Sequence, residues 1–121
     1  MSLCILGLAH ALTISATVFS LSWIHSAEGT RWEETWRVAD GELQVTEARV
    51  KGSGAGMEPA ETAVLRGGWW VFRPNVPPQE KLLLAASGAT QDGWLLCADG
   101  DCWSLGKSSG PTITVQSCEF Q

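Results

Sequence analysis

"TVFSLSWIHSAEGTRWEETWRVADGELQVTEARV", residues 17–50, decides the fold because apolar and polar residues alternate along most of it. Phe19 and Leu21 share one face of an extended strand, and Trp36 and Val38 share a face of the next. A strand that is apolar on one face needs a second layer to cover that face. We therefore predict neighbouring antiparallel strands that bury this face in a core.

Turn signals divide the rest of the chain into similar short runs. Asp40-Gly41 and Asp99-Gly100 are strong signals for two-residue type I′ hairpin turns. No segment keeps a helical period, and 121 residues with 45% hydrophobic content suffice for one modest core. We predict an all-β protein, a single antiparallel β-sandwich or small barrel spanning residues 1–121.

The first sixteen residues are apolar without a basic start. "SLCILGL" and "ALTISA" are interpreted as two short strands of the domain. A degenerate secretory signal is the alternative, although a signal usually begins with Lys or Arg. The apolar run is interrupted too often for a membrane helix, so we do not expect an integral membrane protein.

The charge balance limits the classes of partner. The formal net charge is −5, and no run of Lys or Arg occurs. Nucleic-acid binding is therefore not expected, and neither is attraction to an anionic membrane surface.

Counting residue pairs outward from two predicted hairpin turns places four polar side chains on one face. A turn centred on Gly29-Thr30 places His25 opposite Glu34. A turn at Asp40-Gly41 then places Glu34 opposite Glu47 and Trp32 opposite Arg49. Two opposed carboxylates repel unless a positive charge lies between them.

These residues form the candidate binding site. Arg49 would clamp a carboxylate ligand, His25 and Glu34 would orient it, and Trp32 would pack against the guanidinium. The glycine loop that follows, with Gly54 and Gly56, would form the lip of the site. It lacks the Gly-Lys-Ser/Thr ending of a phosphate loop, and we expect no cofactor.

Two alternatives stay open for this cluster. It can be a structural ion-pair network that fixes the strand register, with no ligand at all. It can be a metal site of His25, Glu34 and Glu47 in a metal-dependent hydrolase, although the nearby Arg49 would oppose a cation. No nucleophile is placed beside the histidine, so enzymatic activity is not expected.

A different surface supports an interaction module. Trp69 and Trp70 are neighbours on a predicted strand, so their side chains point to opposite faces and one faces outward. An outward indole can dock on a partner protein without any small-molecule site.

The four cysteines form two candidate pairs. Cys97 and Cys102 flank the Asp99-Gly100 turn at a non-hydrogen-bonded position, where the Cα atoms come close. Cys4 and Cys118 remain, one near each end of the sequence. Two disulfides indicate an extracytoplasmic or periplasmic location, whereas four reduced thiols would suit the cytoplasm.

Three blocks resemble a small bacterial family, DUF1850: "WIHSAEGTRWEETWRV", "LQVTEARVKGSGAGMEP" and "GGWWVFRP". Genes of this family commonly lie beside those of TAXI-type TRAP transporters. The resemblance implies an accessory role in the uptake of organic acids, with the solute-binding or membrane subunits as partners. Residues 27–29 read Ala-Glu-Gly where the family suggests Val-Glu-Lys, which removes a positive charge from this turn.

Overall fold

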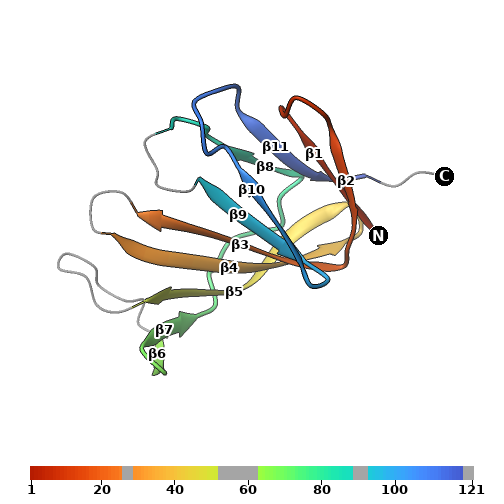
Figure 1. Ribbon diagram of the computed structural model, residues 1–121. Coiled ribbons are helices and arrows are strands. Elements are labelled where there is room, and N and C mark those ends of the chain that lie inside the picture. The colour runs from red at the N-terminus through yellow and green to blue at the C-terminus, as the bar shows by residue number, and fades with distance from the viewer. Residues whose placement is uncertain (26–28, 52–62, 89–92, 119–121) are drawn as a thin grey trace.

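The computed structural model describes residues 1–24, 29–51, 63–88 and 93–118. It also describes the backbone, but not the side chain, of His25. Within these residues the chain forms a sandwich of two antiparallel sheets that does not close into a barrel (Figure 1). This confirms the predicted all-β class. The strands are β1 (Ser2–Leu6), β2 (Leu12–Ser15), β3 (Val18–His25), β4 (Thr30–Ala39), β5 (Glu42–Lys51), β6 (Val64–Arg66), β7 (Trp69–Phe72), β8 (Lys81–Leu84), β9 (Trp94–Ala98), β10 (Asp101–Leu105) and β11 (Ile113–Ser117).

The smaller sheet ties the first described strand to the last. Its strand order is β2-β1-β11-β8. The disulfide between Cys4 and Cys118 joins β1 to the end of β11, with 5.7 Å between the Cα atoms. The predicted pairing of these cysteines is therefore confirmed.

The larger sheet has the order β10-β9-β3-β4-β5-β7-β6. Its tight turns at Asp40-Gly41, Gly67-Gly68 and Asp99-Gly100 have positive φ at both residues, as type I′ turns require. In the last of these hairpins Cys97 pairs with Cys102, and the two form the second predicted disulfide.

The core lies between the two sheets. Each sheet contributes alternate residues of its strands, and the side chains of Phe19, Leu43 and Leu96 are almost fully buried. From the larger sheet come Phe19, Leu21, Trp36, Val38, Leu43 and Val45, and from the smaller Leu3, Ile5, Ile14, Leu84, Ile113 and Val115. The apolar face predicted for residues 19–45 is therefore the buried face. Each large side chain in it stabilises the fold by about 1.5–3 kcal/mol.

The register between β3 and β4 differs from the predicted one. Trp23 pairs with Trp32 and Phe19 pairs with Trp36, and both ring pairs are stacked. His25 consequently pairs with Thr30, whereas Glu34 pairs with Leu21. Aromatic cross-strand packing outweighs the predicted contact of His25 with Glu34. Four residues of strand, about 13 Å, separate His25 from the position opposite Glu34.

The register between β4 and β5 is right near the turn and wrong beyond it. Val38 pairs with Leu43 and Trp36 with Val45, as predicted, but an irregularity follows between Thr35 and Trp36. Thr35 pairs with Glu47, which leaves Thr46 as an extra residue of β5. The Thr46 hydroxyl donates a hydrogen bond of 3.2 Å to the Thr35 carbonyl oxygen.

This bulge exchanges the faces of all following β5 residues. Glu47 and Arg49 lie on the face of the sheet opposite to Glu34 and Trp32. The sequence signals the change, because the buried residues of β5 have odd numbers up to Val45 and even numbers from Ala48.

Candidate functional site

The long central strands place the predicted site residues on two separate faces. Figure 1 shows β3, β4 and β5 extending past the smaller sheet. We call this part the distal end, defined as residues 22–25, 30–34 and 48–51 with the β6–β7 hairpin. Its inner face continues the core face and carries Trp23, Trp32, Glu34, Val50 and Trp70. Its outer face carries Ser22, Arg31, Glu33, Arg49, Lys51 and Trp69.

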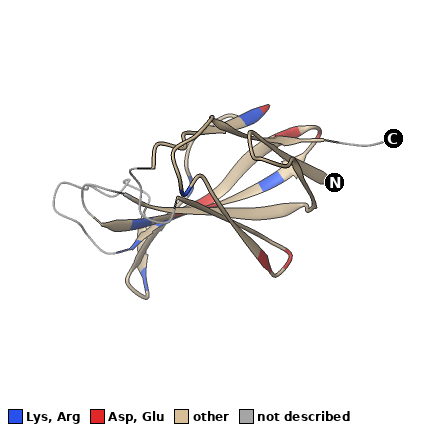
Figure 2. Cartoon of the chain, turned by 45° about the horizontal axis from the view of Figure 1, so that its top comes forward, with Lys and Arg blue, Asp and Glu red and all other residues tan. Residues whose placement is uncertain are grey.

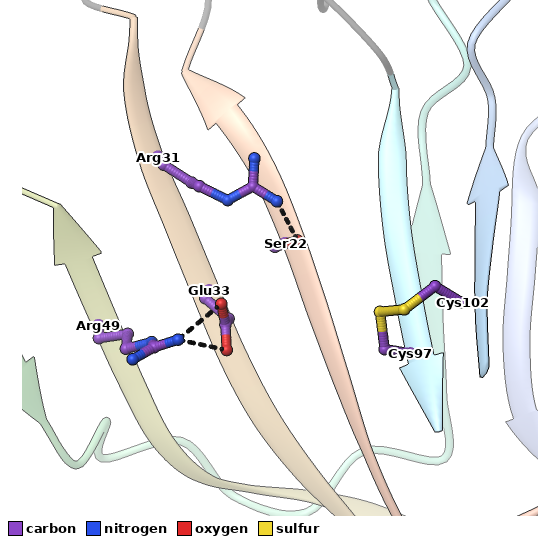
Figure 3. Close-up of polar contacts among 6 residues, drawn as sticks. All are labelled: Ser22, Arg31, Glu33, Arg49, Cys97 and Cys102. Atoms are coloured by element: carbon purple, nitrogen blue, oxygen red, sulfur yellow. Dashed lines mark hydrogen bonds and ion pairs between the residues drawn. A yellow bond between two sulfur atoms is a disulfide. The ribbon is translucent and has the colours of Figure 1, made fainter. Parts of the chain in front are cut away.

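An ion pair lies at the centre of the outer face. Arg49 is directly opposite Glu33, and its Nη2 donates hydrogen bonds of 3.1 Å to both carboxylate oxygens (Figure 3). The Arg49 side chain is 37% exposed and that of Glu33 is 24% exposed. An ion pair so open to water contributes at most about 1 kcal/mol to stability. Glu33, which is adjacent to the predicted Glu34 in sequence, thus takes the place expected for a carboxylate beside Arg49.

Trp69 lies beneath two cations. The Arg49 guanidinium carbon is 4.2 Å from the centre of the indole ring, and Lys51 Nζ is 5.0 Å from it. Trp69 therefore has the role that the sequence assigned to Trp32, since Trp32 lies on the inner face. The prediction that one of the two neighbouring tryptophans faces outward is confirmed, because Trp69 pairs with Lys51 on this face while Trp70 pairs with Val50 on the other.

A second guanidinium, that of Arg31, also lies on the outer face. Arg31 Nη2 donates a hydrogen bond of 3.2 Å to the hydroxyl oxygen of the buried Ser22 (Figure 3). The two residues line a depression of about 280 Å³ together with Trp23, Ile24, Gly93, Leu95 and Ser104. The sequence prediction missed Arg31 and Ser22, because only the correct β3–β4 register brings them to neighbouring positions on the two strands.

Positive charge gathers at the distal end. Five of the eight Lys and Arg side chains of this acidic chain belong to it or to the residue that follows β7 (Figure 2). They are Arg31, Arg49, Lys51, Arg66 and Arg73. No run of sequence contains them, and the strand order alone brings them together.

The inner face holds a carboxyl group among apolar side chains. Glu34 lies between Leu21 and Ala48 on the neighbouring strands, and Trp36 Nε1 donates a hydrogen bond of 3.2 Å to Glu34 Oε1. Burial raises the pKa of the Glu34 carboxyl, and the hydrogen bond from Trp36 opposes this shift in part.

Tryptophans surround the apolar part of this face. Trp23 stacks on Trp32 with 6.2 Å between ring centres and contacts Trp94 at 5.1 Å. Trp32 Nε1 is buried, and no acceptor for it is found in the described part of the chain. Such an N–H lowers stability unless it meets a partner.

The structure does not bring the described residues of the predicted site together. Trp32 and Glu34 lie on the inner face and Glu47 and Arg49 on the outer face, so Glu34 and Glu47 do not converge on one ion. The described residues contain no cluster of three His, Cys, Asp or Glu side chains arranged for a metal. The His25 side chain, Gly54 and Gly56 lie outside the described residues. A ligand at any of these positions stays a prediction.

The described residues contain no helix long and apolar enough to cross a membrane.

Comparison with known proteins gives one match. A family model described as a domain of unknown function, DUF1850, matches residues 19–105, which extend from β3 to the end of β10. No curated protein and no solved structure matches the chain.

Proposed function

Because this chain belongs to the DUF1850 family, whose description assigns no activity, we propose from the site itself that it is a non-enzymatic binding protein for a small organic carboxylate. The observation that supports this proposal is the pair of cations on one indole, Arg49 and Lys51 over Trp69. Guanidinium and ammonium groups bind carboxylates, while the indole offers an apolar surface to the rest of the ligand.

Arg49 keeps binding capacity beside its ion pair. Both hydrogen bonds to Glu33 come from Nη2, and within the described residues Nη1 and Nε keep N–H groups to donate. A carboxylate can accept from this free edge of the guanidinium and approach Lys51 at the same time. Glu33 then has a defined role, because it fixes the orientation of Arg49 and also competes with the ligand for positive charge.

We place the protein outside the cytoplasm, as an accessory of TRAP-type uptake of organic acids. Two disulfides support an oxidising compartment. The link to TRAP transport rests on the gene neighbourhood that the family resemblance implies. A TRAP solute-binding or membrane subunit is the partner expected on this basis.

A ligand screen tests the binding function. Dicarboxylates and other small organic acids are added to the full chain, and the melting temperature is measured. A ligand that binds only the folded state raises the melting temperature by mass action. Arg49→Ala should abolish the rise. Glu33→Gln should enlarge it at a given ligand concentration, because the competing charge is removed while an acceptor stays.

Arg37→Ala is the matched control. Arg37 is an exposed arginine of the same strand and face as Glu33, but it pairs with Val18 and Gln44, far from Trp69. It should leave the ligand response unchanged. If no organic acid shifts the melting temperature, or if Arg49→Ala and Arg37→Ala act alike, a carboxylate site at Arg49 is ruled out.

The second candidate function is a protein-interaction module without a small-molecule site. The partly exposed indole of Trp69 favours it, because a partner protein can cover this side chain as well as a ligand can. Co-purification with TRAP subunits that is lost in Trp69→Ala, in a protein that responds to no organic acid, would support this function. A hydrolase is not proposed, since Glu34 and Glu47 lie on opposite faces.

A further inference from the structure

The β6–β7 hairpin exposes apolar side chains on both of its faces. Val64 pairs with Val71 on the outer face and is 51% exposed, while Leu65 pairs with Trp70 on the inner face and is 56% exposed. β6 is the edge strand farthest from the core in the order β5-β7-β6. Figure 1 shows this hairpin at a corner of the molecule, away from the smaller sheet.

Tryptophans follow directly after the tip of the hairpin. The tip is Gly67-Gly68, where both residues have positive φ, and Trp69 and Trp70 come next with partly exposed side chains. Tryptophan is the residue type that collects at the boundary between hydrocarbon and water, because its ring is apolar and its N–H is polar.

Cations lie beside the apolar side chains of the outer face. A groove of about 440 Å³ next to β6 is lined by Val64, Arg66, Val71, Phe72 and Arg73, with Glu47 as its one acidic residue. Lys51 lies across from Trp69. Exposed apolar side chains with cations beside them suit an anionic bilayer, because apolar burial and attraction to anionic headgroups then act together.

From this arrangement we propose that the β6–β7 hairpin docks the domain peripherally on an anionic lipid bilayer. Val64, Leu65 and the indole of Trp70 enter the interface, and Arg66 and Arg73 bind headgroup phosphates. A fluid bilayer can surround a protruding hairpin, whereas a protein surface covers one of its faces. The net charge of −5 predicts repulsion from an anionic bilayer. It is a sum over the whole molecule, however, and the cations gather at one end.

The docking does not depend on the carboxylate site, because Arg49 has no part in it. The two proposals can therefore fail separately. A protein that binds organic acids but not vesicles would overturn the docking alone.

Vesicle flotation with the full chain tests the docking. The vesicles are phosphatidylcholine with phosphatidylglycerol, and pure phosphatidylcholine serves as the uncharged comparison. The protein should float with the anionic vesicles, and the floated fraction should fall as salt is added. Leu65→Ser should lower the partition coefficient roughly tenfold through lost apolar burial, and Arg66→Gln roughly fivefold through one lost charge.

Matched variants exist elsewhere on the molecule. Leu83 on β8 is 63% exposed, so Leu83→Ser removes an equally exposed leucine from the smaller sheet, and Arg37→Gln removes an arginine far from the hairpin. Both should float like the wild type. Because all four positions are on the surface, circular dichroism should show unchanged folds.

Three results would overturn the docking. The first is a wild-type protein that does not float with anionic vesicles. The second is an equal effect of Leu65→Ser and Leu83→Ser. The third is retention on immobilised polyglutamate without flotation, which would identify an acidic protein as the partner instead.

Discussion

Glu33 and Arg49 face each other across β4 and β5 because Thr46 is an extra residue between Val45 and Glu47. With an uninterrupted ladder, Arg49 would pair with Trp32 and point to the inner face. Arg49 is on the outer face, where it can meet a ligand, because Thr46 bulges out and takes no place in the ladder.

Deleting Thr46 should leave the fold and the outer face intact. Val45 would still pair with Trp36 and Glu47 with Thr35, so the ladder becomes regular without moving Arg49 to the other face. The expected cost is about 1 kcal/mol for the lost hydrogen bond to the Thr35 carbonyl. Deleting Ala48 instead should cost several kcal/mol, because it turns Arg49 toward the apolar face. Urea unfolding measures both, and equal losses would show that the bulge does not set the register.

Glu34→Gln should stabilise the protein at neutral pH. Because burial raises the pKa of the Glu34 carboxyl in the folded state, the protonated form is favoured there. The contribution of this group to stability is therefore complete below the unfolded value of 4.5 and is lost as the pH rises through the folded pKa. Glutamine stays neutral and still offers an oxygen to Trp36 Nε1.

Melting temperatures at two pH values test the predicted stabilisation by Glu34→Gln. Glu34→Gln should melt above the wild type at pH about 7 and close to it well below the unfolded pKa. Glu42→Gln changes the net charge by the same amount on the outer side of β5 and is the control. A Glu34→Gln protein that is less stable than the wild type at neutral pH would indicate that the carboxylate has a favourable partner in the folded protein.

The two disulfides should differ in their contribution to stability. Cys4 and Cys118 are 114 residues apart, whereas Cys97 and Cys102 are 5 apart. In the chain-entropy model, the long loop is worth about 5 kcal/mol and the short one about 2 kcal/mol. Urea unfolding of the two double Cys→Ser variants compares them. A larger loss from the short loop would contradict the entropic explanation.

Local pattern predicts much of this fold, but errors in two strand registers displace the predicted site. The alternation around Phe19 and Leu21 and the Asp-Gly turns give the strands, the buried face and the Cys97–Cys102 pair, because these depend on neighbours in sequence. The β3–β4 register could not be obtained in this way. It is fixed by stacking of Trp23 on Trp32, and counting from a presumed turn does not include that interaction.

The arrangement of the distal end could not be predicted from strand pairing without a bulge. The change from odd to even apolar positions between Val45 and Ala48 is visible in the sequence. A prediction that included it would have placed Arg49 opposite Glu33. No local pattern shows that Trp69 lies beneath Arg49, because the two residues meet only through the pairing of β5 with β7.

The Glu33–Arg49 pair should be weakly coupled, so that its loss affects binding far more than stability. With side chains 37% and 24% exposed, a double-mutant cycle with Arg49→Ala and Glu33→Gln should give a coupling energy below about 1 kcal/mol. Arg49→Ala also removes the contact with Trp69, which adds about 0.5–1 kcal/mol at such an exposed position. The variant should thus unfold close to the wild type while losing its response to organic acids. A coupling of several kcal/mol would instead make the pair a structural element, and a lost ligand response could then reflect a damaged sheet.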